Sequence, residues 1–527
     1  MKKNLIFTLI LVIFCVLVLG LSLRGLSGNP TAKELNTDTW KENGPLELSP
    51  DRGRYALAYS LAEDVSTHFS LEVARLATPD LGISPNGNFV SLFAPTVSYI
   101  VLPGYVIGKI FNLAQVGMFS MISIFGILNF LLIIWISNKL GANKIASVLG
   151  AFAFLFASPA LAYAVSLYQH HITVFLILSS VAALMKWEGL KPLWYVWFMC
   201  ALSISVDNPN LFFMLPIGVY ALGRFISVDK KEDGSISPRI NYKGIITLSA
   251  MILPIVFFLW FNWSANGSPL QLSGTLPAVK NIDESGKPFN GDHEIEIVDG
   301  KVKLQEGKTA VSSFDTRNLL EGFYVHSFSP DRGVVWFAPV LLFGFLGLWM
   351  LYTKDRTSAN LLGAIMGANI LLYSMWGDPW GGWAFGSRYL IPSYAILSIG
   401  ISIFLSRWRN NYIILALFSL VFAYSAWVNT LGAITSSTNP PQAEILGLEA
   451  QTGKIEKYTY ERNLDYLKSN RSKAFVFKEY SHKIMTAEQY HSIILSLIYS
   501  GFMSLMCVFV FHDWFIKSIN IGEKINE

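Results

Sequence analysis

The sequence predicts an all-α integral membrane protein with about twelve transmembrane helices. Of its 527 residues, 52% are hydrophobic and only 14% are charged, whereas soluble domains carry about a quarter charged residues. Apolar runs long enough to cross a bilayer recur along the chain, and basic residues gather in the short loops between them. The net charge of +4 is small, so nothing indicates a nucleic-acid partner. The expected partners include the membrane lipids themselves.

The first apolar run follows Met1-Lys2-Lys3 and has no convincing small-x-small cleavage site, so we expect a retained helix and not a signal peptide. Runs of about 18 to 25 apolar residues define the other spans. The predicted spans are 5–23, 115–137, 145–166, 170–187, 193–206, 209–226, 244–262, 334–352, 358–376, 389–406, 411–433 and 490–516.

Loop charge predicts the orientation. With a cytoplasmic amino terminus, every short inner loop is basic, as the positive-inside rule requires. The residues concerned are Lys139, Lys144, Lys186, Lys191, Arg224, Lys230, Lys231, Arg239, Lys243, Lys354, Arg356, Arg407 and Arg409. A thirteenth span at 97–111 would invert all later loops, so we expect that segment to lie along the outer interface. The prediction is a plasma (inner) membrane protein with both termini cytoplasmic.

Three long segments then face outward. The first, 24–114, should hold helices, because Ser49-Pro50 is a helix-start signature. The second, 263–333, contains an alternating run about Asp299-Gly300, which predicts a β-hairpin. The third, 434–489, is polar and is expected to form a small outer subdomain. The predicted division is a transmembrane catalytic region at 1–433, this subdomain, and a final helix and cytoplasmic tail at 490–527.

Asp51 opens the sharpest polar motif, DRGRYA, in the first outer segment. A carboxylate at the boundary between water and lipid can take a proton from an attacking hydroxyl, so Asp51 is the candidate general base. An equally simple interpretation is that Asp51 complements the positive end of a helix dipole. Arg54 and Tyr55 follow it as candidate substrate contacts.

The densest motif, WGDPWGGWAFGSRY, precedes a span on the outer side. Indole rings stack on sugars, glycines allow close backbone approach, and a guanidinium binds phosphate bidentately. The alternative is an interfacial aromatic belt with a snorkelling arginine. The candidate substrate-binding residues here are Asp378, Trp380, Trp383, Arg388 and Tyr389.

Arg332 is a second outer arginine before a span, and is either a phosphate contact or half of a local pair with Asp331. The three cysteines all lie in apolar stretches, which argues against a disulfide framework or a thiolate metal site. His170 and His171 are adjacent on a helix and point about 100° apart, which disfavours a shared metal ion. No cofactor and no metal ligand is therefore predicted, although the sequence leaves metal use open.

These two motifs, with the amino-terminal span and the interfacial segment, resemble the GT-C membrane glycosyltransferases. The resemblance is greatest to the branch of protein O-mannosyltransferases and lipid A aminoarabinose transferases. It implies that Asp51 is the catalytic base and that outer arginines such as Arg388 hold the phosphate of a polyprenyl-phosphate sugar donor. Members often carry a second acid directly after the aspartate, where this chain has Arg52. The resemblance covers the layout of residues 1–433.

The sequence thus predicts an inverting glycosyltransferase that moves a monosaccharide from a polyprenyl-phosphate donor to an acceptor hydroxyl on the outer face. The acceptor would be a glycan, a lipid or a protein. Two alternatives remain: a transporter or flippase of lipid-linked sugars, and a non-catalytic subunit of an envelope assembly. A transporter usually places ionisable residues near the bilayer midplane, whereas the candidate residues here lie at the predicted outer rim.

Overall fold

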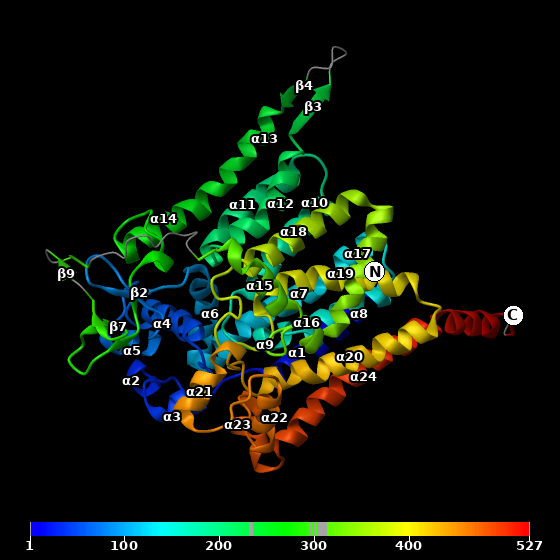
Figure 1. The fold of residues 1–527 in the computed structure, drawn as a ribbon. Helices are drawn as coiled ribbons and strands as arrows, with labels where there is room; N and C mark the ends of the chain where they lie inside the picture. The colour runs from blue at the N-terminus through cyan, green and yellow to red at the C-terminus, as the bar shows by residue number, and fades with distance from the viewer. Residues whose placement is uncertain (1, 231–235, 296, 299–300, 303–312, 526–527) are drawn as a thin grey trace.

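The computed structural model describes residues 2–230, 236–295, 297–298, 301–302 and 313–525. Its main body is a bundle of apolar helices (Figure 1). Helices α2 to α6 and α21 to α23 gather at one end of the bundle, although long stretches of sequence separate the two groups (Figure 1). The strand pair β3–β4 projects from the other end. The segments predicted to face outward therefore lie on one side.

Six helices of the described residues are long and apolar enough to cross a membrane. These stretches are Leu5–Ser22, Ala114–Lys139, Tyr242–Asn266, Arg388–Arg407, Tyr412–Ile434 and Ala487–Phe511. Four of them belong to single helices: α1 (Lys2–Ser22), α7 (Ala114–Lys139), α20 (Tyr412–Ile434) and α24 (Ala487–Ile525). The stretch Tyr242–Asn266 consists of α13 (Tyr242–Ile246), η1 (Thr247–Met251) and α14 (Ile252–Asn266). The stretch Arg388–Arg407 consists of η5 (Arg388–Leu390) and α19 (Ile391–Arg407).

Shorter helices occupy the other predicted spans. They are α8 (Lys144–Phe156), α10 (His170–Lys186), α11 (Lys191–Val206), α12 (Asn210–Leu222), α17 (Leu342–Lys354) and α18 (Arg356–Ser374). The predicted arrangement of about twelve spans is confirmed in its helical elements. Two spans are broken where they were expected to be continuous. Pro159 separates α8 from the short α9 (Ala160–Ala164), and Pro339 separates α16 (Val334–Phe337) from η4 (Pro339–Leu341) and α17, because proline cannot donate to the preceding turn.

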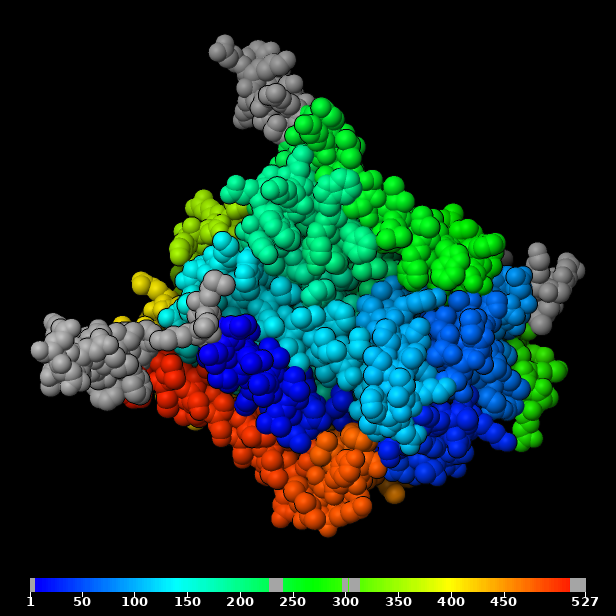
Figure 2. All heavy atoms as spheres, turned by 180° about the vertical axis from the view of Figure 1, so that it is seen from behind, coloured from blue at the N-terminus to red at the C-terminus, as the bar shows by residue number. Residues whose placement is uncertain are grey.

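Glycines bring helices into direct backbone contact inside the bundle. Gly344 and Gly347 of α17 face Leu397 and Gly400 of α19, where any added Cβ would collide with the opposite main chain. Small residues at such crossings are how apolar helices gain close packing when lipid offers no hydrophobic driving force. In Figure 2, α1 lies on the surface beside α24, so the first and last spans are neighbours.

The first outer segment folds largely as expected. Helix α4 (Ser49–Glu63) begins at Ser49-Pro50, and α6 (Thr96–Ile110) forms from the segment predicted to lie at the interface. Around them lie α2 (Ala32–Leu35), α3 (Asp38–Asn43), α5 (Leu71–Ala77), β1 (Leu81–Ile83) and β2 (Phe89–Ser91). Strand β1 pairs antiparallel with β2 and with β5 (Ala278–Val279) of the second outer segment, which joins the two segments in one sheet.

The predicted hairpin of the second outer segment is confirmed in its paired strands. Strand β9 (Ile297–Val298) is antiparallel to β10 (Lys301–Val302), with Val298 opposite Lys301. The Asp299-Gly300 turn itself falls outside the described residues. The sequence did not predict the neighbouring sheet of β6 (Asn281–Ile282), β7 (Pro288–Asn290) and β8 (His293–Glu294), or the pair of β3 (Ile226–Lys230) and β4 (Ile236–Ile240). Helix α15 (Leu319–Ser327) ends this segment.

The third outer segment consists of short helices: η6 (Gln442–Glu444), α21 (Ile445–Thr452), α22 (Glu461–Lys468), α23 (Phe475–Glu479) and η7 (Ser481–Lys483). It is anchored to the amino-terminal region by a buried ionic network. Arg24, just after α1, pairs with Glu47 at 2.8 Å and donates to Ser437 Oγ at 3.1 Å. Burial raises the pKa of Glu47, but the charges of Arg24 and Lys473 outweigh it and hold that pKa below its usual range.

Candidate functional site

Asp51 lies in the first turn of α4 and is fully buried. Its Oδ1 accepts a hydrogen bond of 3.0 Å from the backbone N–H of Leu167, and its Oδ2 has no hydrogen-bond partner among the described residues. Burial raises the pKa of Asp51 to about 7, although Arg24 and Arg54 oppose the shift. A carboxylate with that pKa exchanges protons near neutral pH, which suits a general base or acid.

Arg54 lies three residues further along the same helix and is also buried. It donates to Gln169 Oε1 at 2.6 Å and to the Leu167 carbonyl at 3.3 Å, while its Nε has no partner within the described chain. Burial lowers the pKa of this guanidinium, yet an arginine stays protonated in proteins. Helical spacing thus holds a fixed positive charge one turn from Asp51.

Arg388 approaches the same place from η5, at the end of the tryptophan-rich loop. Its Nη2 donates to the Gly381 carbonyl at 2.6 Å, and neither its Nε nor its Nη1 has a partner among the described residues. The guanidiniums of Arg388 and Arg54 lie 4.9 and 5.4 Å from the centroid of one ring, that of Tyr168. Two buried cations therefore converge on one aromatic side chain, and no carboxylate of the described residues lies at salt-bridge distance from either.

Both arginines line one cavity of about 430 Å³. Its aromatic and polar walls combine residues of α4, α11, α12, α18 and η5 with residues from several loops, so no single motif builds it. Its lining comprises Pro50, Arg54, Leu92, Phe93, Ala94, Tyr168, Gln169, Ile204, Val206, Asp207, Asn208, Pro209, Leu211, Phe212, Leu272, Gly274, Thr275, Ser313, Phe314, Tyr373, Trp376, Arg388 and Tyr389. Asp51 is not among them, although Pro50 and Arg54 on either side of it are.

Sequence reasoning missed Asp207 as a charged wall of this cavity. Asp207 ends α11, and its Oδ2 accepts from Gln169 Nε2 at 2.8 Å, which continues the chain of hydrogen bonds from Arg54. Burial raises the pKa of Asp207. The available signal was its place in Asp207-Asn208-Pro209 between two short spans, which is equally typical of a helix boundary.

Tyr389 lines the cavity, as the sequence predicted for a substrate contact, and it lies parallel to Tyr373. Their ring centroids are 4.2 Å apart with an interplanar angle of 1°. Tyr373 and Trp376 come from the end of α18 and the start of the loop; Trp376 is the first residue of the predicted motif, but neither was among the candidate substrate contacts. The aromatic surface of the cavity therefore combines the two ends of that motif with Tyr373 and Tyr168 outside it.

The other residues predicted to bind substrate lie elsewhere. Arg332 is fully buried and donates to the backbone carbonyls of Trp380, Gly382 and Asn439 at 2.9 to 3.0 Å, as well as to that of Asp331. With its donors engaged by the main chain, it holds the tryptophan-rich loop in place and does not reach the cavity. In this structure Arg332 therefore supports the loop, and a phosphate contact at Arg332 stays a prediction.

Asp378, Trp380 and Trp383 also do not line the cavity. Asp378 is exposed and accepts from the backbone N–H of Gly382 at 2.5 Å, so it shapes the loop. Trp383 donates from Nε1 to Glu444 at 2.8 Å, on the third outer segment. Trp383 thus ties the loop to the third outer segment, and contact of Trp380 and Trp383 with a sugar stays a prediction.

Tyr55 is likewise away from the cavity, because, as the next residue of α4, it points about 100° away from Arg54. It is buried, and its ring packs against Tyr59 and Tyr105 at centroid distances of 6.2 and 6.1 Å. His170 and His171 do diverge, and His171 Nε2 lies 2.8 Å from the Ala160 carbonyl. Among the described residues, no three His, Cys, Asp or Glu side chains come together in a group that could hold a metal ion.

The chain is similar in structure to ArnT from Cupriavidus metallidurans. The apo crystal structure of ArnT gives a TM-score of 0.44 at 12% sequence identity, covering 97% of this chain and 77% of ArnT. The crystal structure of ArnT bound to undecaprenyl phosphate gives 0.43 at 14% identity, covering 97% and 78%. No family model matches this sequence. No curated protein matches it either.

Proposed function

We propose that this chain is an integral-membrane glycosyltransferase that transfers a sugar from a polyprenyl-phosphate donor to an acceptor hydroxyl. One observation carries the proposal. Two buried guanidiniums, with N–H groups that lack partners among the described residues, share an aromatic cavity and lie beside a buried carboxylate whose pKa is about 7. That combination suits an anionic leaving group, a sugar ring and a proton acceptor.

The donor phosphate would lie between Arg54 and Arg388. Charge-assisted hydrogen bonds to phosphate are roughly twice as strong as neutral ones, and the buried setting strengthens them further. The sugar would stack on the faces of Tyr168, Tyr389 or Trp376, as sugar rings do on aromatic side chains. Ile204, Val206 and Leu211 offer apolar contact to the first isoprene units.

Asp51 would remove the proton from the acceptor hydroxyl as its oxygen attacks the anomeric carbon. The bond between that carbon and the donor phosphate oxygen breaks, the configuration inverts, and polyprenyl phosphate leaves with its charge held by the two arginines. Leu167 N–H engages Oδ1, so the acceptor proton would pass to Oδ2, which has no partner among the described residues. Because Asp51 is fully buried, the acceptor would reach it by displacing the 167–169 segment. We infer that donor binding against Gln169 and Tyr168 promotes this movement.

The test uses the purified full-length protein in detergent with a synthetic polyprenyl-phosphate hexose and an extract of envelope acceptors. Mass spectrometry follows the release of polyprenyl phosphate and the gain of a hexose on acceptors. An Arg54→Ala/Arg388→Ala variant should lose both signals, whereas Arg407→Ala, at an exposed position far from the cavity, should retain them. Donor movement across proteoliposomes without any sugar transfer would favour the transporter instead.

A further inference from the structure

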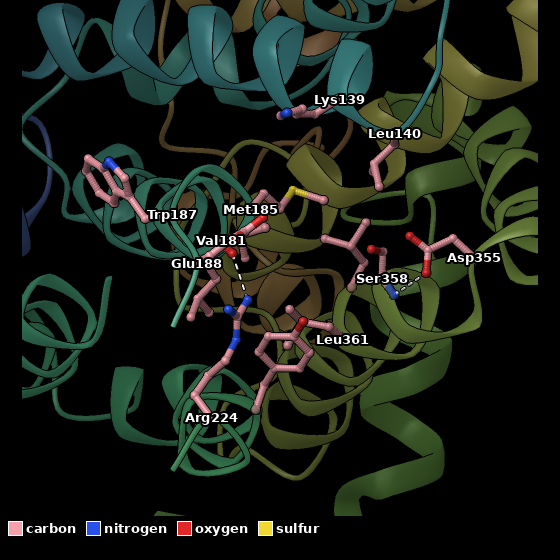
Figure 3. A pocket seen from close by; sticks show the side chains of 13 residues that line it. Lys139, Leu140, Val181, Met185, Trp187, Glu188, Arg224, Asp355, Ser358 and Leu361 are labelled. Atoms are coloured by element: carbon pink, nitrogen blue, oxygen red, sulfur yellow. Dashed lines mark hydrogen bonds between the residues drawn. The ribbon is translucent and has the colours of Figure 1, made fainter. Parts of the chain in front are cut away.

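A second cavity, of about 370 Å³, lies where four helix ends meet. Figure 3 shows it with Lys139 at the end of α7, Glu188 just after α10, Arg224 just after α12, and Asp355 between α17 and α18. Its remaining walls are mainly apolar or aromatic: Leu140, Val181, Leu184, Met185, Trp187, Tyr220, Ser358, Leu361 and Leu362.

This cavity is at the opposite end of the bundle from the Asp51 site. Helices α12 and α18 border both cavities, but from opposite ends: α12 gives Leu211 to one and Tyr220 to the other, while α18 gives Tyr373 and Ser358. Along α18, the 15 residues from Ser358 to Tyr373 rise roughly 22 Å, most of the thickness of a hydrocarbon core. The second cavity therefore belongs to the other membrane surface, and nothing about it depends on the proposed function.

The charged residues of this cavity carry both signs, and among the residues that the structure describes no salt bridge joins any two of them. Arg224 donates to the Leu184 carbonyl at 2.9 Å and lies 5.7 Å from the centroid of the Tyr220 ring. Asp355 Oδ1 accepts from the Ser358 backbone N–H at 3.1 Å. Lys139 and Glu188 are exposed at the rim. The cavity thus presents two cations, two carboxylates and an apolar wall at a membrane surface.

We propose that this cavity binds the headgroup of a membrane phospholipid that carries both a phosphate and a primary ammonium, as phosphatidylethanolamine does. Lys139 and Arg224 would bind the phosphate, since ammonium and guanidinium groups form charge-assisted hydrogen bonds with it. Glu188 and Asp355 would receive the ammonium through charge-assisted hydrogen bonds. Val181, Leu184 and Leu361 would contact the glycerol and the first acyl carbons. Basic pockets between helices at this surface are a known setting for lipid headgroups.

The carboxylates decide between lipid classes. A purely anionic headgroup, such as that of phosphatidylglycerol, would satisfy the two cations but meet the uncompensated charges of Glu188 and Asp355. Phosphatidylcholine has a positive charge without N–H donors, so it would form fewer hydrogen bonds with the carboxylates. The lining therefore predicts the order phosphatidylethanolamine, phosphatidylcholine, phosphatidylglycerol.

Native mass spectrometry of the full-length protein in detergent, with equimolar dioleoyl forms of the three lipids, tests this order. Wild type should retain phosphatidylethanolamine in preference to the others. Lys139→Gln/Arg224→Gln removes two charge-assisted contacts and should reduce its retention about a hundredfold or more, since each contact contributes roughly tenfold or more. Glu188→Gln, at an exposed position that should leave the fold intact, should narrow the preference over phosphatidylglycerol. Lys144→Gln/Arg407→Gln, which removes two exposed cations outside this cavity, should change nothing.

Three results would overturn the proposal. The first is equal or stronger retention of phosphatidylglycerol by wild type. The second is unchanged lipid selectivity in Glu188→Gln. The third is displacement of the lipid by millimolar inorganic phosphate, which would identify the ligand as a free anion. None of these readouts involves sugar transfer, so a failure here is separate from a failure of the proposed function.

Discussion

At the scale of single residues, Asp51 combines properties that a surface carboxylate in the first turn of a helix does not have. A dipole-complementing aspartate is normally solvated and ionised, with its pKa near or below its usual value. Asp51 is fully buried, and burial raises its pKa to about 7. Helix stabilisation alone does not account for a carboxylate held in this way.

Asp51→Asn should therefore nearly abolish sugar transfer while leaving donor binding intact, since the amide keeps the size but not the basicity. Loss of a general base costs about 100-fold to 10,000-fold in rate. Transfer rates and donor affinity measured on the same preparation check this. If Asn supports normal transfer, Asp51 has no part in the chemistry.

The pH dependence follows from the same group. As a base with a pKa of about 7, Asp51 should make the transfer rate rise with pH through 7 and level off above it. Its folded-state pKa is higher than in the unfolded chain, so the folded protein binds the proton more tightly. The contribution of Asp51 to the free energy of unfolding is therefore fully present below about pH 4 and is lost as pH rises through 7. The Asn side chain of Asp51→Asn is neutral at every pH. The Tm of this variant should therefore exceed that of wild type at pH 8, and the difference should vanish near pH 4.

Arg388 gives a prediction about donor binding. Arg388→Ala should weaken donor binding by about 2 kcal/mol or more, because a buried contact between opposite charges is lost. Arg388→Lys should recover only part, since lysine lacks the planar fork. Titration of a polyprenyl phosphate into each purified variant measures the two affinities. Unchanged affinity in both would leave Arg388 as an interfacial anchor.

At the scale of elements, the middle of the tryptophan-rich loop is held by hydrogen bonds to its neighbours, and its two ends line the cavity. Arg332 donates to the loop carbonyls of Trp380 and Gly382 and to the carbonyl of Asn439 on the third outer segment. Trp383 of the loop donates to Glu444. Only Trp376, Arg388 and Tyr389, at its two ends, line the cavity. We infer that the hydrogen bonds that hold the middle of the loop also fix the position of Arg388, which follows it in the chain.

Arg332→Met should accordingly destabilise the protein more than Arg388→Ala does. Three carbonyls lose a charged donor, and hydrogen bonds to charged groups contribute about 1.5 to 3 kcal/mol each. Thermal unfolding in detergent should show a loss of about 3 kcal/mol or more for Arg332→Met and a smaller one for Arg388→Ala. The opposite order would mean that Arg332 is dispensable for the loop.

At the scale of the whole molecule, the two cavities lie at opposite ends of the helix bundle. Buried charge concentrates beside α4 at one end, where long segments cover the bundle, and solvated charge of both signs rims the cavity at the other. From the basic short loops, the positive-inside rule predicts that this second end is cytoplasmic.

Cysteine labelling tests this orientation. Glu284→Cys should react with an impermeant thiol reagent added outside intact cells, and Asn410→Cys should react only after permeabilisation. Both positions are exposed, and Cys507→Ser serves as the background because Cys507 is the exposed native thiol. Reaction of Asn410→Cys from outside would overturn the predicted topology.

The sequence by itself determined the helical membrane class, the positions of the apolar helices, the helix that begins at Ser49-Pro50 and the paired strands of the hairpin. Each of these depends on local hydropathy, turn chemistry or helix-start signals, which act over a few residues. Asp51, Arg54 and Arg388 could be chosen because a charge beside an apolar span needs an explanation.

The tertiary structure alone decided which of these residues meet. Tyr168, Gln169 and Asp207 join Arg54 from loops more than a hundred residues away, and no local pattern encodes that convergence. Arg332 and Arg388 look equivalent in sequence, each just before a span on the predicted outer side. They differ because the carbonyls of a distant loop engage Arg332 in the fold, whereas Arg388 retains N–H groups that have no partner among the described residues. Whether a buried cation serves structure or function depends on which acceptors the fold brings to it.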